Sequence, residues 1–260
     1  MKTRLNPAMT RTLTRLASVA ALAVGALTAS VAAASGGGNL LPFKADSGNL
    51  ASVQRGARNY MAYCSGCHSM KYLRYNRMGE DLGIPEDVLK KNLMFTSDKT
   101  GDQIRVAMPA ASEQWFGRIP PDLSLETRAR GAAWVYTYLN SFYLDASRPL
   151  GVNNTVLAGA SMPHVLWQLQ GWQKPAEHAA EGDAHGGGHA SGPKFELVTA
   201  GSLKPSEYAA FTADLVNFMD YAAEPGKQAR ISLGLKVMLY LFGLLVLTYL
   251  LKKEFWRDVH

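Results

Sequence analysis

Residues Cys64-Ser65-Gly66-Cys67-His68 carry the strongest structural signal in this 260-residue sequence. They read C-x-x-C-H, the pattern to which c-type haem is attached. Two thiols three residues apart near the end of a helix can each add to one vinyl group of a porphyrin, and the neighbouring imidazole can then bind the iron. Gly66 leaves room for the edge of the macrocycle. We therefore predict one covalent haem c, held by Cys64 and Cys67 and ligated by His68.

The same two cysteines allow three other interpretations, which the rest of the sequence weakens. A structural zinc site needs four ligands, usually from two such pairs, and the sequence holds only two cysteines. A thioredoxin-like dithiol would follow a strand in a βαβ unit, whereas the residues upstream have helical spacing. A plain disulfide, as in an exported metal-binding or adhesion module, gives no role to His68.

Residues 1–34 have the order of a secretory signal peptide. Four basic residues precede an apolar run over residues 17–31, and small residues follow at 32–38. The run is short and rich in alanine, so it would span a bilayer poorly. We predict cleavage near Ala34 and export of the residues that follow.

A second apolar stretch, residues 231–251, predicts a transmembrane helix. It matches the roughly 20 residues that a spanning helix needs, and Lys236 is its one charged residue. Lys236 lies close enough to one end for its ammonium group to reach the interface. We assign residues 227–260 to a membrane anchor in contact with lipid, with a short cytoplasmic tail, because export places residues 35–226 in the periplasm.

The formal charge of +6 does not indicate a nucleic-acid partner. The whole excess lies in residues 1–34 and 231–260, and the residues between them carry equal numbers of basic and acidic side chains. No basic surface for a polyanion is expected there. Nucleic-acid binding is therefore excluded.

Between the signal and the anchor, the spacing of apolar residues predicts short helices joined by long loops. Pro85 suits a first helical position, and Pro120-Pro121 requires extended chain before the next helix. The expected elements are helices over 52–70, 85–95, 122 or 124 to 143, and 206–222, with a short β-hairpin over 194–203. The predicted fold class is mainly α, with a cytochrome c-like haem domain over residues 35–226.

Residues 176–192 differ from the rest of this domain. They are rich in Gly, Ala, Glu and His and hold no large apolar residue, so they cannot bury enough surface to order themselves. We predict a flexible loop. A metal site on His178, His185 and His189 is the alternative, but such tracts bind metals without forming specific sites.

The predicted iron needs a sixth ligand, and methionine suits an electron carrier because a thioether stabilises ferrous iron. Met108 and Met162 both precede proline in loop-like sequence, and His164 is a third candidate. Spacing from His68 does not choose among them. Four other methionines lie on predicted helical faces and are expected to fill the core: Met61, Met70, Met94 and Met219.

The sequence resembles the cytochrome c1 family, the haem subunits of bacterial cytochrome bc1 complexes, over nearly all of residues 40–260. C-x-x-C-H alone indicates a cytochrome c, and Pro-Pro-Asp-Leu-Ser with a C-terminal anchor is far more specific. The matching stretches are Cys-Ser-Gly-Cys-His-Ser-Met at 64–70, Ala-Met-Pro-Ala at 107–110, Pro-Pro-Asp-Leu-Ser at 120–124 with Arg-Ala-Arg at 128–130, Met-Pro-His-Val-Leu-Trp at 162–167, and the anchor ending in Lys-Lys-Glu-Phe-Trp-Arg-Asp-Val-His.

The resemblance implies roles for particular residues. Met162 becomes the sixth ligand, and Met108 becomes a pocket or packing residue. Pro120 and Pro121 are expected beside the porphyrin, and Arg130 near a haem propionate, which a guanidinium can neutralise. Residues 176–192 depart from the family pattern, which leaves the structure of that loop open.

The resemblance also implies a function. The chain would accept single electrons from a Rieske iron–sulfur protein and pass them to a soluble or membrane-bound cytochrome c. It would do so beside cytochrome b, in a dimeric respiratory complex of the bacterial inner membrane, and make or break no substrate bond itself. The alternative is a membrane-tethered cytochrome c that serves a terminal oxidase or a denitrification enzyme directly.

Overall fold

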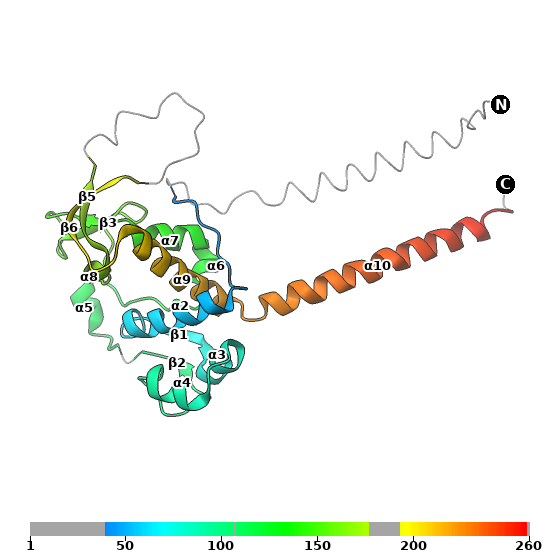
Figure 1. Cartoon of the computed structure of the whole chain (residues 1–260), viewed down its shortest axis with the longest axis horizontal. Coiled ribbons are helices and arrows are strands. Elements are labelled where there is room, and N and C mark those ends of the chain that lie inside the picture. The colour runs from blue at the N-terminus through cyan, green and yellow to red at the C-terminus, as the bar shows by residue number, and fades with distance from the viewer. Residues whose placement is uncertain (1–39, 107, 177–192, 259–260) are drawn as a thin grey trace, which may run out of the picture. The chain divides into compact units, whose positions relative to one another are not determined.

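The computed structural model describes residues 40–106, 108–176 and 193–258, a set of short helices with three small sheets and one long C-terminal helix (Figure 1). The predicted signal peptide lies outside the described residues, as do His178, His185 and His189. The helices are α2 (Leu50–Tyr63), α3 (Tyr75–Leu82), α4 (Glu86–Asn92), α5 (Ser112–Phe116), α6 (Glu126–Arg130), α7 (Ala132–Asn140), α8 (Trp167–Gln170), α9 (Pro205–Ala223) and α10 (Lys227–Phe255).

The strands form three antiparallel pairs, β1 with β2, β3 with β4 and β5 with β6. Their helical surroundings confirm the mainly α class. The strands are β1 (Met70–Arg74), β2 (Gln103–Ile104), β3 (Phe142–Leu144), β4 (Val152–Asn154), β5 (Gly171–Pro175) and β6 (Phe195–Ala200).

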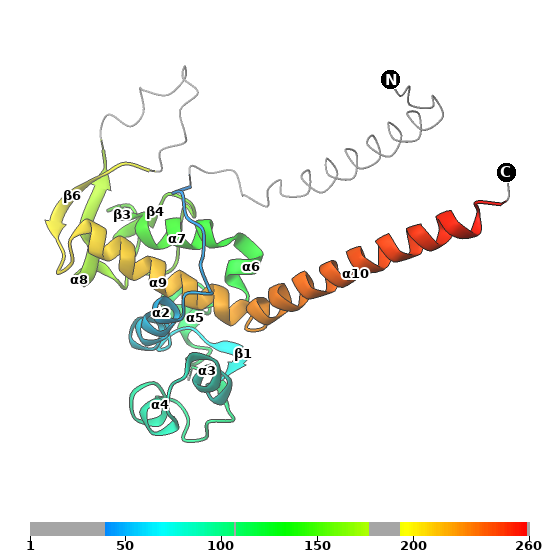
Figure 2. The same ribbon diagram turned by 45° about the vertical axis from the view of Figure 1, so that its right-hand side comes forward.

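The centre of the fold is the packing of α9 against α2, α6 and α7, which can be followed in Figures 1 and 2. Gly56 permits the close approach of α2 to α9, because a Cβ there would lie 2.0 Å from the carbonyl oxygen of Asp214. The Asp214 carboxylate accepts hydrogen bonds from Ser52 Oγ (2.5 Å) and Arg55 Nε (2.6 Å). The first and last described helices of the haem domain, α2 and α9, are thus joined by both packing and polar contacts.

The main core is continuous and includes the four methionines that were predicted to fill it. Tyr60, Leu215 and Phe218 are among its largest fully buried side chains. All four are buried, although Met70 lies on a strand and Met94 lies beyond the end of α4: Met61, Met70, Met94 and Met219.

Two of the predicted helices were wrong in extent. The helix expected over 52–70 ends at Tyr63, because the chain turns at the cysteine motif and residues 70–74 then pair with β2. The helix expected to reach Tyr143 is divided at Gly131, whose φ of 89° is outside the helical range. It ends at Asn140, and residues 142–144 pair with β4 instead.

The predicted hairpin over 194–203 was wrong in its partner. Residues 195–200 do form a strand, but β6 pairs with β5 at residues 171–175, which precede the 176–192 segment. Helix α9 agrees with its predicted extent to within a residue at each end. Helix α4 begins directly after Pro85 and ends at Asn92, three residues short of the predicted end.

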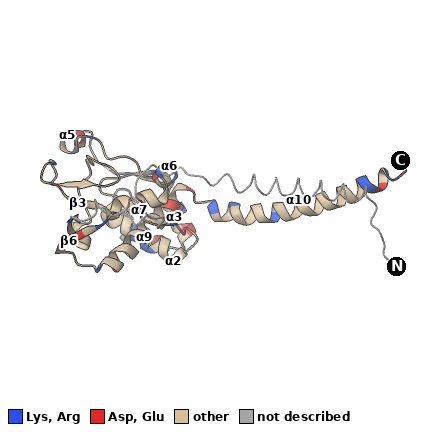
Figure 3. Ribbon diagram, turned by 90° about the horizontal axis from the view of Figure 1, so that it is seen from above, with Lys and Arg blue, Asp and Glu red and all other residues tan. Residues whose placement is uncertain are grey.

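Helix α10 has 29 residues and is long and apolar enough to cross a membrane. Its basic residues lie in its first third and near its C-terminal end, on either side of the uncharged residues 237–251 (Figure 3). This helix fits a single-pass membrane anchor.

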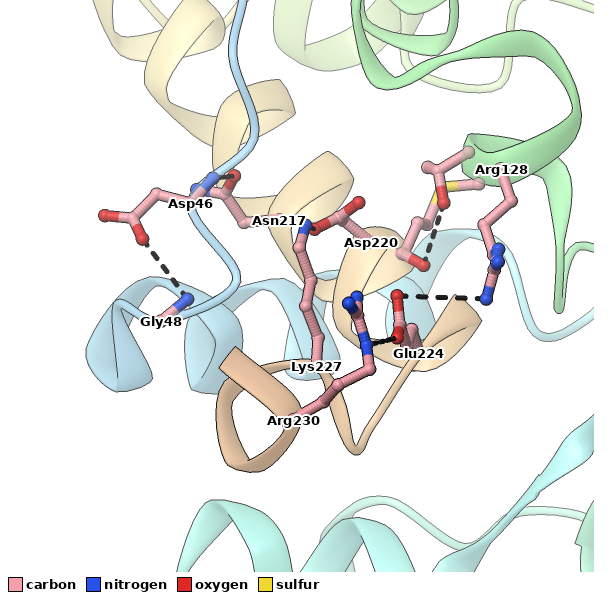
Figure 4. Close-up of polar contacts among 10 residues, drawn as sticks. Asp46, Gly48, Arg128, Asn217, Asp220, Glu224, Lys227 and Arg230 are labelled. Atoms are coloured by element: carbon pink, nitrogen blue, oxygen red, sulfur yellow. Dashed lines mark hydrogen bonds and ion pairs between the residues drawn. The ribbon is translucent and has the colours of Figure 1, made fainter. Parts of the chain in front are cut away.

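Ion pairs surround the junction of α9 and α10 (Figure 4). Asp220 accepts from Lys227 Nζ at 2.7 Å, and Glu224 accepts from Arg230 Nε at the same distance. Glu224 also lies 3.8 Å from Nη1 of Arg128 on α6. The first turn of α10 is therefore tied to the end of α9, and Glu224 there also reaches α6.

Candidate haem site

A cavity lies among the described residues, with about 1160 Å³ of empty space that includes some open solvent. Its walls are mostly aromatic and aliphatic. The motif turn, α6, α7, α9 and the loop before α8 all contribute to it. Every predicted site residue lies in its lining: Cys64, Cys67, His68, Pro120, Pro121, Arg130 and Met162.

The two cysteines leave α2 in a tight turn that directs both toward this cavity. The backbone N–H groups of Cys67 and His68 donate to the carbonyl of Cys64 at 3.0 and 2.9 Å. Both thiols are free. Burial raises the pKa of Cys64 to about 12, so its thiol is protonated and uncharged at neutral pH.

His68 is held in the state that a metal ligand requires. Its Nδ1 lies 2.7 Å from the backbone carbonyl oxygen of Pro121. A carbonyl only accepts, so Nδ1 must carry the proton, and the lone pair of Nε2 is left for iron. Burial lowers the pKa of His68 and so favours the neutral imidazole. The hydrogen bond to Pro121 raises the pKa by a smaller amount.

The Pro-Pro-Asp-Leu-Ser segment is fixed by hydrogen bonds to the chain that follows His68. Leu123 N donates to the Ser69 carbonyl at 2.8 Å, and Asp122 Oδ2 accepts from Lys71 N at 2.8 Å. These contacts place the Pro121 carbonyl against the imidazole. The family resemblance implied that both prolines lie beside the porphyrin. It did not indicate this role, because a backbone carbonyl leaves no signal in residue type or spacing.

Met162 is the one sixth-ligand candidate that contributes to the described lining. Met108 and His164 do not contribute to it. His164 is buried in a separate cluster, where its ring stacks on Phe142. Met219, expected only as core, also forms part of the wall, since α9 passes beside the cavity.

Arg130 lies in the wall, as the predicted role beside a propionate requires, and it already has partners. It bonds through Nε to the Glu126 carboxylate, and its guanidinium lies 4.4 Å from the centroid of the Trp134 ring. Glu126, Trp134 and Arg118 line the same cavity. A carboxylate that enters here would meet two arginines and one acidic side chain.

These residues fit a c-type haem. Two free thiols, an imidazole whose Nε2 is available and a thioether face one apolar cavity. A helix that is long and apolar enough to cross a membrane follows the domain. The fold and the site define a membrane-anchored c-type cytochrome.

Comparison with known proteins narrows this class. Residues 44–259 match the Cytochrome C1 family, and the chain belongs to that family. It is 49% identical to cytochrome c1 of Allochromatium vinosum over 87% of this chain and 93% of that protein. It is 44% identical to the ammonia monooxygenase gamma subunit of Nitrosomonas europaea over 83% of this chain and 86% of that protein. It is 27% identical to cytochrome b/c1 of Bradyrhizobium diazoefficiens over 80% of this chain and 33% of that protein.

Family membership establishes a haem electron-transfer subunit with a covalently bound c-type haem. The helix Lys227–Phe255 is its candidate anchor. The prediction of one haem c is confirmed at this level. The individual roles of the seven site residues stay predictions: Cys64, Cys67, His68, Met162, Pro120, Pro121 and Arg130.

Proposed function

We propose that this chain accepts single electrons from a Rieske iron–sulfur protein and passes them to a soluble or membrane-bound cytochrome c. It does so as the haem subunit of a dimeric cytochrome bc1 complex. The observation that carries the proposal is the motif turn, which presents Cys64, Cys67 and His68 to one apolar cavity in a chain of this family.

Bound haem supplies reversible one-electron chemistry at its iron, and the protein sets the conditions for it. His68 gives a neutral nitrogen ligand whose orientation is held by Pro121. Met162 offers a thioether, which favours ferrous iron. The apolar walls exclude water and disfavour the extra charge of ferric iron, which raises the potential further.

The proposed complex agrees with the anchor and with one relative. The name cytochrome b/c1 of the Bradyrhizobium diazoefficiens protein joins both subunit names, and this chain spans a third of that protein. We place residues 1–34 as a removed signal peptide, residues 35–226 in the periplasm and residues 227–260 in the bacterial inner membrane with a cytoplasmic tail. Lipid then surrounds α10.

The test is purification of the tagged full chain from membranes in mild detergent. We expect a pyridine haemochrome spectrum of covalent haem c, and cytochrome b and a Rieske protein in the same particle. Addition of quinol should then reduce the haem, and a quinol-site inhibitor should prevent it.

The same experiment separates the alternatives. Recovery with a terminal oxidase, a denitrification enzyme or a monooxygenase, without cytochrome b, would replace the proposal by a tethered cytochrome that serves that enzyme. The name of the Nitrosomonas europaea relative makes the last of these worth an explicit search. A colourless protein with both thiols free would contradict every haem function.

A further inference from the structure

His164, two residues after Met162, turns away from the cavity into a second, smaller core. Its side chain is only 5% exposed. The imidazole stacks on Phe142, with 5.1 Å between ring centroids and 8° between planes, and meets Trp172 edge-on at 5.8 Å. One aromatic ring therefore contacts the face of the imidazole and a second meets it edge-on.

The same small core also packs against Met162. Phe142, Val152 and Ala160 are its buried members, and Met162 and Trp172 pack against them. Met162 also lines the haem cavity. In the loop before α8, Met162 thus lies at the cavity and the His164 ring lies in the small core. One short backbone segment connects these two residues.

One polar atom of the imidazole is poorly satisfied. Its Nε2 is buried without a hydrogen bond of normal geometry among the described residues, and so is Oε1 of Gln170 beside it. A buried polar atom in this state costs free energy. Interactions with the Gly171 backbone and the Gln170 side chain, together with the contacts to Phe142 and Trp172, hold the residue in place.

We propose that His164 is a positioning residue for the axial methionine. A methionine side chain has three rotatable bonds, so its sulfur can occupy many positions. A fixed backbone is required before packing can restrict the sulfur to one of them. The His164 ring, held between Phe142 and Trp172, fixes that backbone. The proposal rests on ligation by Met162, which belongs to the proposed function.

The test compares four variants of the haem-loaded full chain: His164→Ala, His164→Phe, Val152→Ala and Met162→Ala. Val152 is the matched control, because it is buried in the same core on β4, outside the ligand loop. The measurements are the near-infrared sulfur-to-iron band, the midpoint potential and the thermal unfolding midpoint Tm.

We expect His164→Ala to lose most of the near-infrared band and to lower the potential. His164→Phe keeps an aromatic ring against Phe142 and Trp172, so it should retain the band. Val152→Ala should lower Tm and leave the band intact.

The outcomes distinguish the two proposals. If Met162→Ala keeps the band, ligation by Met162 is wrong and the role of His164 falls with it. If Met162→Ala abolishes the band while His164→Ala keeps it, only the positioning role is wrong. Equal loss in Val152→Ala and His164→Ala, or loss in His164→Phe, would also overturn the positioning role.

Discussion

At the scale of single residues, the site is defined by which side chains reach one cavity. His68 and Met162 are 94 positions apart in the sequence, yet both line it. Between them, the Pro121 carbonyl selects the tautomer of His68. The chemistry of the ligands can be read from residue type, but their convergence cannot.

Replacement of the predicted axial methionine should change the iron directly. Met162→Ala should abolish the near-infrared sulfur-to-iron band and lower the potential, because the thioether that favours ferrous iron is gone. Potentiometry and near-infrared absorption are the measurements. Met108→Ala and Met219→Leu are the controls and should keep the band. Loss of the band in either control, with Met162→Ala unaffected, would reassign the ligand.

Replacement of Arg130 should shift the potential without altering ligation. Arg130→Gln removes a positive charge from the cavity wall, which makes ferric iron less unfavourable, so the potential should fall by on the order of tens of millivolts. Arg128→Gln, two residues away and outside the described cavity lining, should have a smaller effect. Equal shifts in both variants would show a general surface effect rather than a contact with a propionate.

At the scale of elements, the crossing of α2 and α9 holds the haem domain together. Gly56 allows it, since a Cβ there would lie 2.0 Å from Asp214 O and 2.7 Å from Phe218 Cβ. Backbone cannot move aside as a flexible side chain can. The cysteine motif directly follows α2, so the crossing also determines where the motif turn lies.

Gly56→Ala should therefore destabilise the folded domain by about 2–3 kcal/mol, the upper part of the usual range for overpacking a tight core. Thermal or denaturant unfolding of the haem-loaded protein measures this loss. Gly101→Ala is the matched control, because a Cβ at Gly101 meets nothing within 4 Å. Equal stability of both variants would mean that the crossing relaxes easily.

At the scale of the whole molecule, the junction of α9 and α10 links the haem domain to its anchor. Glu224 lies at the end of α9 and faces Arg230 on α10 and Arg128 on α6. The hydrogen bond from Arg230 is the main cause of the lowered pKa of Glu224. This carboxylate therefore stabilises the junction while it is ionised.

The sign of the pH dependence follows. The folded pKa of Glu224 lies below its ordinary value near 4.5, so the stabilisation is complete above that value and is lost as pH falls through the lowered pKa. A spin label on Gln228→Cys should become more mobile in acid. Haem attachment consumes both native cysteines, so the label is specific. In the Glu224→Gln variant, the spin label should be mobile at all pH values. A label whose mobility changes neither in acid nor in this variant would show that the ion pairs do not hold the junction.

Local sequence was sufficient for the haem motif, the anchor and the helical class, because each depends on spacing or composition within about 20 residues. The tertiary structure was needed for the break at Gly131 and the pairing of β6 with β5. The Pro121 carbonyl that orients His68 belongs to the same group. Residue spacing did not choose among Met108, Met162 and His164; the family resemblance indicated Met162, and the structure places Met162 in the cavity lining. These features depend on contacts between segments tens of residues apart, and local propensity does not encode which segments meet.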